Sequence, residues 1–426
     1  MLFSQIFLCV IGAAMFSRVA SYVGFPSVIN FVHFPLVFLS FVLVIRASKS
    51  AITKPFLYAG IVLFLLILFS SIINEAGFVN ALLDFVLLME APVFALCIIS
   101  VKWSGKGVLI FRRGMVFVAI VHLMFILYQR FVQGYSGDDV EGLLIGMGAG
   151  SHLSGAIALS LAVYFILLGE ELYGRFSFRY ITMCIPISIL FAATVVFSDA
   201  KQVFAVFLVA SALLTMITLH SFRKVFFLTV SIFASCIVLY KMSQTVFPEL
   251  SNWVEIDLLK EGFVQKFSVF GVIFDAYDSF LNVLFGLGPG HTVGRLAMLL
   301  PEYSSYLDKL GATVSPLTTE IWVLHQGHYM SNSLTGSSMF SLFFSWAGIF
   351  GDIGLVGLSV YLYIYYLVWK HVSVDLFSKF LVITVMVFGW VFQWMEEPQY
   401  MLFTMGLIGL RWQQFQLFER SRTVDV

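Results

Sequence analysis

Long apolar runs recur through most of this chain, and they limit the folds open to it more than any other feature. A helix that crosses a bilayer needs about 20 mainly apolar residues, because each residue rises 1.5 Å through ~30 Å of hydrocarbon. Of the 426 residues, 60% are hydrophobic and 11% are charged, whereas soluble domains have roughly 25% charged residues. The sequence therefore predicts an all-α polytopic integral membrane protein.

Runs of this kind predict about twelve membrane spans. Nine fall within residues 1–247, a large loop subdomain occupies 248–350, and three more spans follow in 351–426. The predicted spans are 2–17, 26–46, 56–74, 78–100, 115–133, 151–169, 180–198, 202–219, 225–247, 351–369, 377–395 and 398–417.

The distribution of basic residues predicts the orientation of these spans. Lys and Arg favour cytoplasmic loops, and a cytoplasmic N-terminus assigns 16 of the 24 basic residues to the cytoplasm. Five of the other eight lie in the long segment near 241–338, and long loops count little in this rule. We therefore expect both termini in the cytoplasm and the large loop in the periplasm of a bacterial inner membrane. The net charge of zero gives no basis for nucleic-acid binding.

The large loop has three recognisable parts. Residues 254–273 form an amphipathic stretch, and Gly286–Leu287–Gly288–Pro289–Gly290 is typical of a turn. Residues 337–350 are apolar but too few to cross a bilayer. They suit a re-entrant or interfacial helix that leads into the tenth span.

Basic residues at the predicted outer ends of spans are candidates for binding an anionic group. Lys201 offers a point charge for a phosphate, with Asp199 setting its orientation. The alternative is a local ion pair that closes a tight turn. Arg130, at the end of the fifth span, offers a bidentate clamp for a pyrophosphate, or else its side chain extends to the membrane interface.

The segment from Gly286 to Arg295 is the densest glycine cluster in the chain. Glycine permits tight turns and close backbone approach, and His291 and Arg295 are candidate ligands for an anion. A turn with no binding role is the alternative. The segment is not a nucleotide-binding fingerprint, because no strand and helix frame it.

His325 and His328 are the candidate general bases, since imidazole titrates near neutral pH. Incidental histidines in a surface loop are the alternative. No further ligand at a recognisable spacing predicts a metal site. Asp352 is expected in the first turn of the tenth span, where it complements the helix dipole. Asp84, Glu90 and His122 are expected to make buried polar contacts.

Three of these stretches, taken in order around one long loop, resemble the superfamily of O-antigen ligases and Wzy-type polysaccharide polymerases. The turn 198–202 is similar to a Ser-Arg pair that opens a span, with Asp199–Ala200–Lys201 in its place. Residues 286–290 resemble the family's Gly-x-Gly-x-Gly step, and residues 352–357 resemble its acid-x-Gly-x-x-Gly closure. The resemblance covers most of the chain as topology, and it implies a fold like that of the GT-C glycosyltransferases.

The resemblance implies a glycosyltransferase that needs no metal or cofactor and acts on undecaprenyl-pyrophosphate-linked sugars at the periplasmic face. Its partners would be that lipid-linked oligosaccharide, membrane lipid and other polysaccharide export proteins. Lys201 and Arg295, with Arg130 as a third candidate, would bind the diphosphate. His325 or His328 would deprotonate the acceptor hydroxyl.

One difference from the family pattern bears on whether this chain is a ligase or a polymerase. Ligases typically have a His-Asn pair about nine residues before the acid, where this chain has Ser341–Leu342–Phe343–Phe344. Many polymerases also lack the pair, so we expect a polymerase of O-antigen, capsule or exopolysaccharide repeat units. A ligase is the closest alternative. A lipid-linked oligosaccharide flippase or other transporter is the more distant one, because the spans are nearly free of charge.

Overall fold

Every regular element in the described part of the chain is a helix. The structure is a computed structural model that describes residues 2–47, 53–146, 150–173, 177–218, 256–331 and 340–424. Within these ranges nine helices are long and apolar enough to cross a membrane. The chain is therefore a polytopic α-helical membrane protein. The nine spans are Leu2–Tyr22, Ser27–Arg46, Lys54–Ile73, Phe78–Ser100, Gly105–Phe131, Gly150–Glu171, Tyr180–Phe197, Lys201–Thr218 and Ser345–His371.

The predicted spans agree with these helices to within a few residues at most ends, but the fifth helix begins at Gly105, ten residues before the predicted start at 115. They correspond to α1 (Leu2–Tyr22), η1 with α2 (Ser27–Phe31, His33–Ala47), α3 (Thr53–Ile73), α4 (Phe78–Ser100), α5 (Gly105–Phe131), α6 (Gly150–Tyr173), η4 with α7 (Tyr180–Cys184, Ile185–Phe197), α8 (Lys201–Thr218) and α15 (Ser345–His371). The predicted ninth span, 225–247, lies outside the described residues. The eleventh corresponds to α16 (Leu376–Phe388), which has only 13 residues, so the count of twelve stays a prediction.

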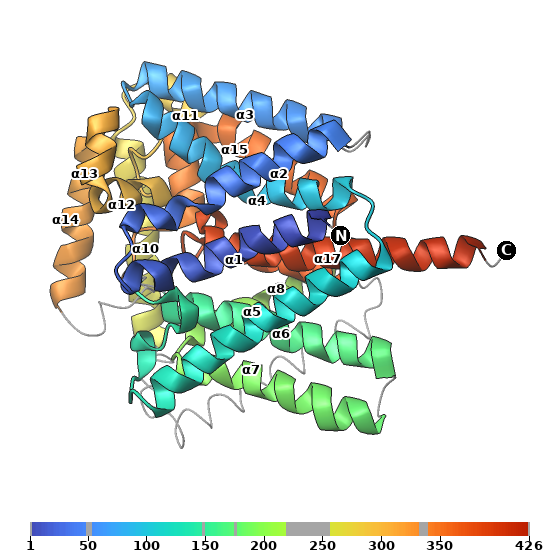
Figure 1. The fold of residues 1–426 in the computed structure, drawn as a ribbon. Helices are drawn as coiled ribbons and strands as arrows, with labels where there is room; N and C mark the ends of the chain where they lie inside the picture. Colours follow the sequence, from blue (N-terminus) through green and yellow to red (C-terminus); the bar gives the residue numbers. More distant parts are fainter. Residues whose placement is uncertain are drawn as a thin grey trace.

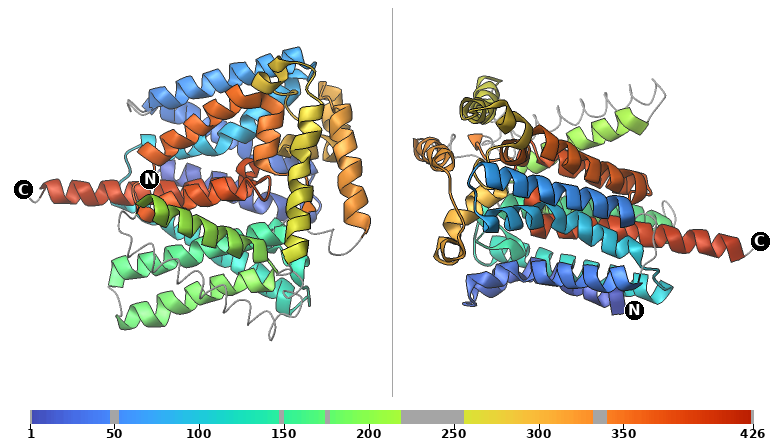
Figure 2. Two further views of the ribbon diagram at one scale, coloured as in Figure 1. Left: turned by 180° about the vertical axis from the view of Figure 1, so that it is seen from behind. Right: turned by 90° about the horizontal axis from the view of Figure 1, so that it is seen from above.

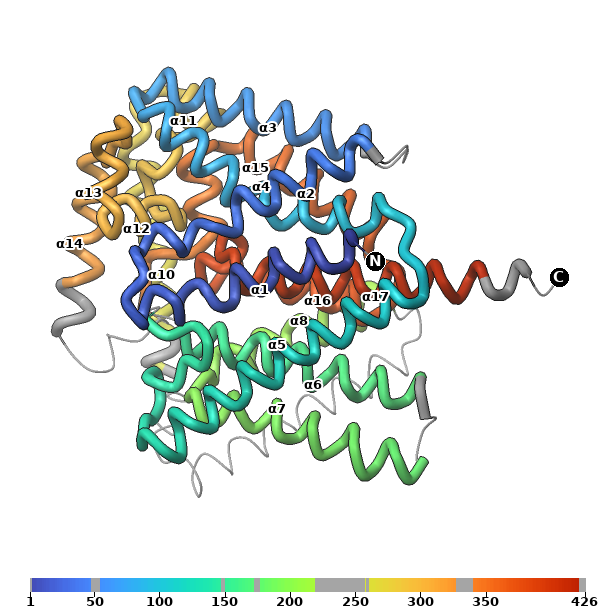
Figure 3. The backbone as a smooth tube through the Cα atoms, in the orientation of Figure 1, coloured from blue at the N-terminus to red at the C-terminus, as the bar shows by residue number. Residues whose placement is uncertain are grey.

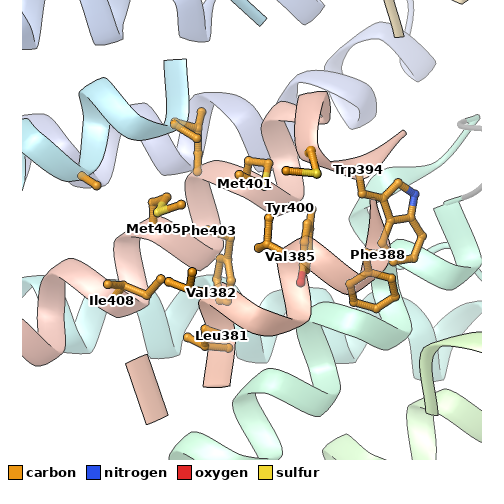
Figure 4. Close-up of a cluster of buried hydrophobic side chains, with 14 of the residues drawn as sticks. Leu381, Val382, Val385, Phe388, Trp394, Tyr400, Met401, Phe403, Met405 and Ile408 are labelled. Atoms are coloured by element: carbon orange, nitrogen blue, oxygen red, sulfur yellow. The ribbon is translucent and has the colours of Figure 1, made fainter. Parts of the chain in front are cut away.

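The twelfth predicted span corresponds to α17 (Pro398–Val424), which lies in the middle of the bundle (Figure 1). It packs against α1, α4, α5, α6 and α16. Gly406 and Gly409 allow this closeness, because a β-carbon at either position would stand within 2.7 Å of an isoleucine side chain. Figure 4 shows the buried side chains between α16 and α17. A helix surrounded by protein needs less apolar surface than one facing lipid, which explains its more polar sequence.

The described residues 256–331, between α8 and α15, form a cap at one end of the bundle. Its described helices are α10 (Ile256–Asp275), α11 (Phe280–Phe285), α12 (Arg295–Glu302), α13 (Ser304–Leu307), η6 (Asp308–Leu310) and α14 (Pro316–Ser331). Figures 1 and 3 show α1 beginning and α17 ending toward the opposite end. This arrangement agrees with termini on one side of the membrane and the large loop on the other. Which side is periplasmic stays a prediction.

Helix α10 crosses the end of the bundle at a steep angle to the long helices (Figure 2). One face of α10 is buried against the bundle, at Lys266, Val269 and Ile273, while the apolar Phe263 and Val264 are exposed, so the predicted amphipathic character stays a prediction. The buried Lys266 ammonium donates to the carbonyl of Ser341 at 3.1 Å.

Helix α15 consists of two segments separated by a kink. Gly354 has φ 66° and ψ −171° inside the helix, a conformation that favours glycine. The predicted start at residue 351 was wrong, because the helix begins at Ser345. Asp352 therefore lies before the kink and not in the first turn. Residues 345–350 of the predicted re-entrant segment belong to α15, and residues 332–339 lie outside the described residues.

Candidate functional site

The glycine cluster pairs directly with the start of α15. Leu287 donates its N–H to the carbonyl of Gly351 at 2.8 Å, and Gly290 donates its N–H to Asp352 Oδ2 at 3.0 Å. A β-carbon on Gly286 would stand 2.3 Å from the Asp352 backbone. Two of the stretches that carry the family resemblance, 286–290 and 352–357, thus lie against each other. Glycine allows their backbones to approach this closely.

Asp352 joins a group of buried charges that we call the Arg295 cluster: Asp84, Arg295, Asp352, Glu396 and Glu397. Arg295 Nη2 lies 2.9 Å from Glu397 Oε2, and the Arg295 N–H donates to Glu396 Oε2 at 2.8 Å. The side chains of Arg295 and Glu397 are 14% and 3% exposed. The cluster therefore has four carboxyl groups and one guanidinium group. An anion would have to compete with Glu397 for the Arg295 guanidinium.

Two carboxyl oxygens of the Arg295 cluster, Asp84 Oδ2 and Glu396 Oε1, are buried without a hydrogen-bond partner among the described residues. A buried carboxyl group without a partner favours its neutral form. Burial accordingly raises the pKa of Glu396 to about 8, and the nearby Asp352 adds to the effect.

The expected buried polar contacts of α4 and α5 are present. Glu90 Oε1 lies 2.6 Å from His33 Nδ1, and Leu143 donates its N–H to His122 Nδ1 at 3.1 Å. Asp84 is 3% exposed. These groups lie inside predicted spans, so the bundle interior contains polar contacts as expected.

A second group of polar side chains, which we call the Lys201 cluster, consists of Asp138, Ser151, His152, Asp199 and Lys201. Lys201 Nζ lies 3.0 Å from Asp199 Oδ1, and this pair closes the short turn between α7 and α8. Asp199 has φ 50°, which is uncommon for a residue other than glycine. The side chains of Lys201 and Asp199 are 22% and 40% exposed.

No sequence motif marks His152, the histidine of this cluster, as a site residue. His152, near the start of α6, places Nδ1 3.0 Å from Ser151 Oγ and 3.5 Å from Asp138 Oδ1. Ser151 Oγ donates to Asp138 Oδ1 at 3.0 Å. The charges of Asp138, Asp199 and Lys201 all act on His152. A histidine within an apolar run resembles an ordinary core residue, and only its neighbours distinguish it.

One short segment after α16 links the two clusters. The His152 ring lies 5.5 Å from the Phe392 ring, edge to face. The next residue, Gln393, donates Nε2 to the carbonyls of Val293 and Gly294 at 2.8 Å and 3.0 Å. The clusters therefore share one end of the bundle. None of the interactions given above joins Lys201 to Arg295.

No family model matches the sequence. No curated protein matches it either. The chemical argument for this chain therefore depends on its own geometry, and the family resemblance stays a proposal.

The remaining predicted site residues that the structure describes have other contacts. Arg130 Nη1 donates to the carbonyl of Tyr135 at 3.0 Å and so supports the loop after α5. His291 Nε2 lies 3.0 Å from Thr313 Oγ1, and burial lowers the pKa of its imidazole. His325 of α14 packs against the rings of Trp322 and Phe343. His328 is in α14, but its side chain lies outside the described residues.

An apolar groove of about 1020 Å³ runs between α8, α10, α15 and α16. Its lining on α15 extends from Trp346 to Trp369, which corresponds to roughly 30–35 Å of helix at 1.5 Å per residue. On α8 the groove begins at Val209, about 12 Å along the helix from Lys201. The structure gives no group of three or more metal-ligating side chains within the described ranges.

Proposed function

We propose that this protein is a polysaccharide polymerase that transfers undecaprenyl-pyrophosphate-linked glycan onto another lipid-linked repeat unit at the periplasmic face of the bacterial inner membrane. The observation that carries the proposal is the position of Lys201. Its partly exposed ammonium group lies at the beginning of α8, the helix that also lines the apolar groove.

The groove suits the hydrocarbon part of such a donor. Its lining is aromatic and aliphatic, and on α15 it extends from Trp346 to Trp369 across the kink. A polyprenyl chain held there would place its pyrophosphate near the end of the bundle that contains the Lys201 cluster. Apolar burial then supplies affinity for the lipid without selecting the sugar.

Lys201 would stabilise the pyrophosphate as it departs, because a fixed positive charge favours negative charge that develops in the transition state. The salt bridge to Asp199 would hold the ammonium group in place before the substrate binds. Arg130 and His291 belong to the proposal as further ligands. Arg295 belongs to it only if the diphosphate displaces Glu397, its present partner at 2.9 Å.

A transporter or flippase is the second candidate, and the Arg295 cluster is the observation that favours it. Ionisable residues inside a membrane bundle commonly mark an ion or proton path. Asp84, Asp352 and Glu396 are each no more than 3% exposed. A flippase would move the lipid-linked glycan without changing its covalent structure, so the products of a reaction distinguish the two functions. A ligase differs only in its acceptor.

The test uses purified full-length protein with undecaprenyl-pyrophosphate repeat units in detergent. We expect the wild type to produce a ladder of longer glycans, and Lys201→Ala to lower kcat/KM about 10²–10³-fold through loss of a fixed charge. Lys309→Ala, an exposed lysine in η6, is the matched control and should elongate normally. Absence of any elongation by folded wild-type protein would exclude the polymerase. Transfer only to a different acceptor would indicate the ligase.

A further inference from the structure

We propose that His152 is the general base that deprotonates the acceptor hydroxyl, and that Asp138 positions it through Ser151. This inference rests on the proposed transferase function and supplies the base that the sequence left unassigned between His325 and His328. It depends on three observations: the hydrogen-bonded relay behind the imidazole, the charges of Asp199 and Lys201 that act on the ring, and the exposure of Asp138 at the edge of this cluster.

The relay fixes which ring nitrogen is available. Ser151 Oγ donates its proton to Asp138 Oδ1 at 3.0 Å, so it accepts from His152 Nδ1 at 3.0 Å. The Nδ1 atom then carries the imidazole proton, and Nε2 presents a lone pair. His152 is thus oriented by Ser151, and Ser151 is oriented by the Asp138 carboxylate. An oriented base of this kind suits general-base catalysis.

The Lys201 cluster is more exposed than the Arg295 cluster. The side chain of Asp138 is 78% exposed and that of His152 is 11% exposed, so the carboxylate faces solvent and the imidazole is mostly buried. Phe392 packs against the ring edge to face. His325 is half-buried and contacts the rings of Trp322 and Phe343.

The charged groups that face His152 come from each element around it. Asp138 lies in the short 3₁₀ helix η2 (Gly137–Asp139), Asp199 lies in the turn before α8, and Lys201 is the first residue of α8. The segment after α16 contributes only the apolar Phe392 ring. The proposed base therefore lies within electrostatic range of the lysine that would bind the leaving group, and a transfer reaction needs both groups at one site.

The reaction balances with these groups alone. The acceptor O–H bond breaks, its proton moves to His152 Nε2, and the acceptor oxygen forms a bond to the anomeric carbon of the donor. The bond from that carbon to the pyrophosphate oxygen breaks, and its electron pair stays on the polyprenyl pyrophosphate beside Lys201. The imidazolium then releases its proton to water.

The test compares elongation rate against pH for wild type, His152→Gln and His371→Gln. His371 ends α15 at the opposite end of the bundle, so its replacement is a matched control that should match the wild type. We expect His152→Gln to reduce the rate about 10²–10⁴-fold, to lose the rise in rate with pH that titration of the base produces, and to keep affinity for the lipid-linked donor.

A second variant tests the relay with less risk to folding. Asp138→Asn alters a mostly exposed side chain, and we expect it to lower the rate and shift the pH profile while donor binding stays unchanged. The proposal is overturned if both variants keep the wild-type pH profile. It is also overturned if His325→Gln loses the rise in rate with pH and His152→Gln keeps it. If folded wild-type protein fails to elongate glycan at all, the proposed function itself fails, whatever the variants do.

Discussion

Glu396 and Glu397 are adjacent in the chain, but their carboxyl groups have different partners. Glu397 is held by the Arg295 guanidinium at 2.9 Å. Glu396 accepts the Arg295 backbone N–H at 2.8 Å and interacts with the Ser345 hydroxyl, but among the described residues it forms no salt bridge and its Oε1 has no hydrogen-bond partner. Gly294 lies between Glu396 and Asp352, where a β-carbon would stand 3.4 Å and 3.0 Å from their oxygens. The Arg295 cluster is thus packed too tightly to gain a counterion readily.

This environment predicts a pH-dependent stability. Burial raises the pKa of Glu396 from 4.5 to about 8, so the folded protein binds a proton that the unfolded chain releases between these values. The contribution is fully present below pH 4.5 and is lost as pH rises through about 8. We expect Glu396→Gln, which stays neutral, to gain thermal stability relative to wild type as pH increases from 5 to 8. An unchanged difference in Tm across this range would show that Glu396 is not protonated in the folded state.

At the scale of elements, the contact between α11 and α15 depends on glycines in an unusual conformation. The backbone of Leu284, in α11, lies so close to Gly354 that an added β-carbon would stand 2.4 Å from its carbonyl. The left-handed φ of Gly354 also redirects α15. The kink lets residues 351–352 meet the glycine cluster while the rest of α15 continues across the bundle.

Gly354→Ala is therefore expected to destabilise the protein by about 2 kcal/mol or more, through strain at positive φ and through overpacking. Gly271→Ala in α10 is the matched control, because no atom lies within 4 Å of its added β-carbon. That control should be neutral or should stabilise by up to about 1 kcal/mol through helix propensity. Thermal unfolding in detergent measures both, and equal Tm values for the two variants would contradict the structural role of Gly354.

At the scale of the whole molecule, the cap helices and the ends of α1 and α17 lie at opposite ends of the bundle (Figures 1 and 2). Ion pairs also differ between the ends. Arg411 binds Asp375 at 2.7 Å and Glu171 at 2.5 Å, which joins α6, α16 and α17 far from the cap. The two polar clusters described above are both at the cap end, so the orientation in the membrane decides which compartment they face.

Cysteine labelling in intact cells tests that orientation. After replacement of the four native cysteines, a single cysteine at Lys309 in η6 should react with a membrane-impermeant maleimide. One at Lys106, near the start of α5, should react only after permeabilisation. Both positions are exposed in the structure, so accessibility within the protein does not bias the comparison. The reverse pattern would place the proposed site in the cytoplasm and exclude a periplasmic polymerase.

Much of the architecture could be predicted from the sequence because hydropathy and amphipathic spacing are local properties. The span boundaries, the helix α10 and the Asp199–Lys201 turn all depend on residues close together in the chain. The apolar pattern also predicted a span at residues 351–369, but it could not show that the helix begins at Ser345 or that Gly354 bends it. Those features depend on which element packs against the helix.

The site itself was decided by tertiary structure. Arg295 and Glu397 are about one hundred residues apart, and their salt bridge depends on how α12 and the segment after α16 are placed relative to each other. His152 lies within an apolar run, and only the loop after α5 and the turn before α8 bring Asp138 and Lys201 to it. A sequence determines which residues favour lipid, water or a helix, because each residue carries that preference itself. Partners across the bundle depend on the rotation and register of whole helices, and only the packed structure fixes these.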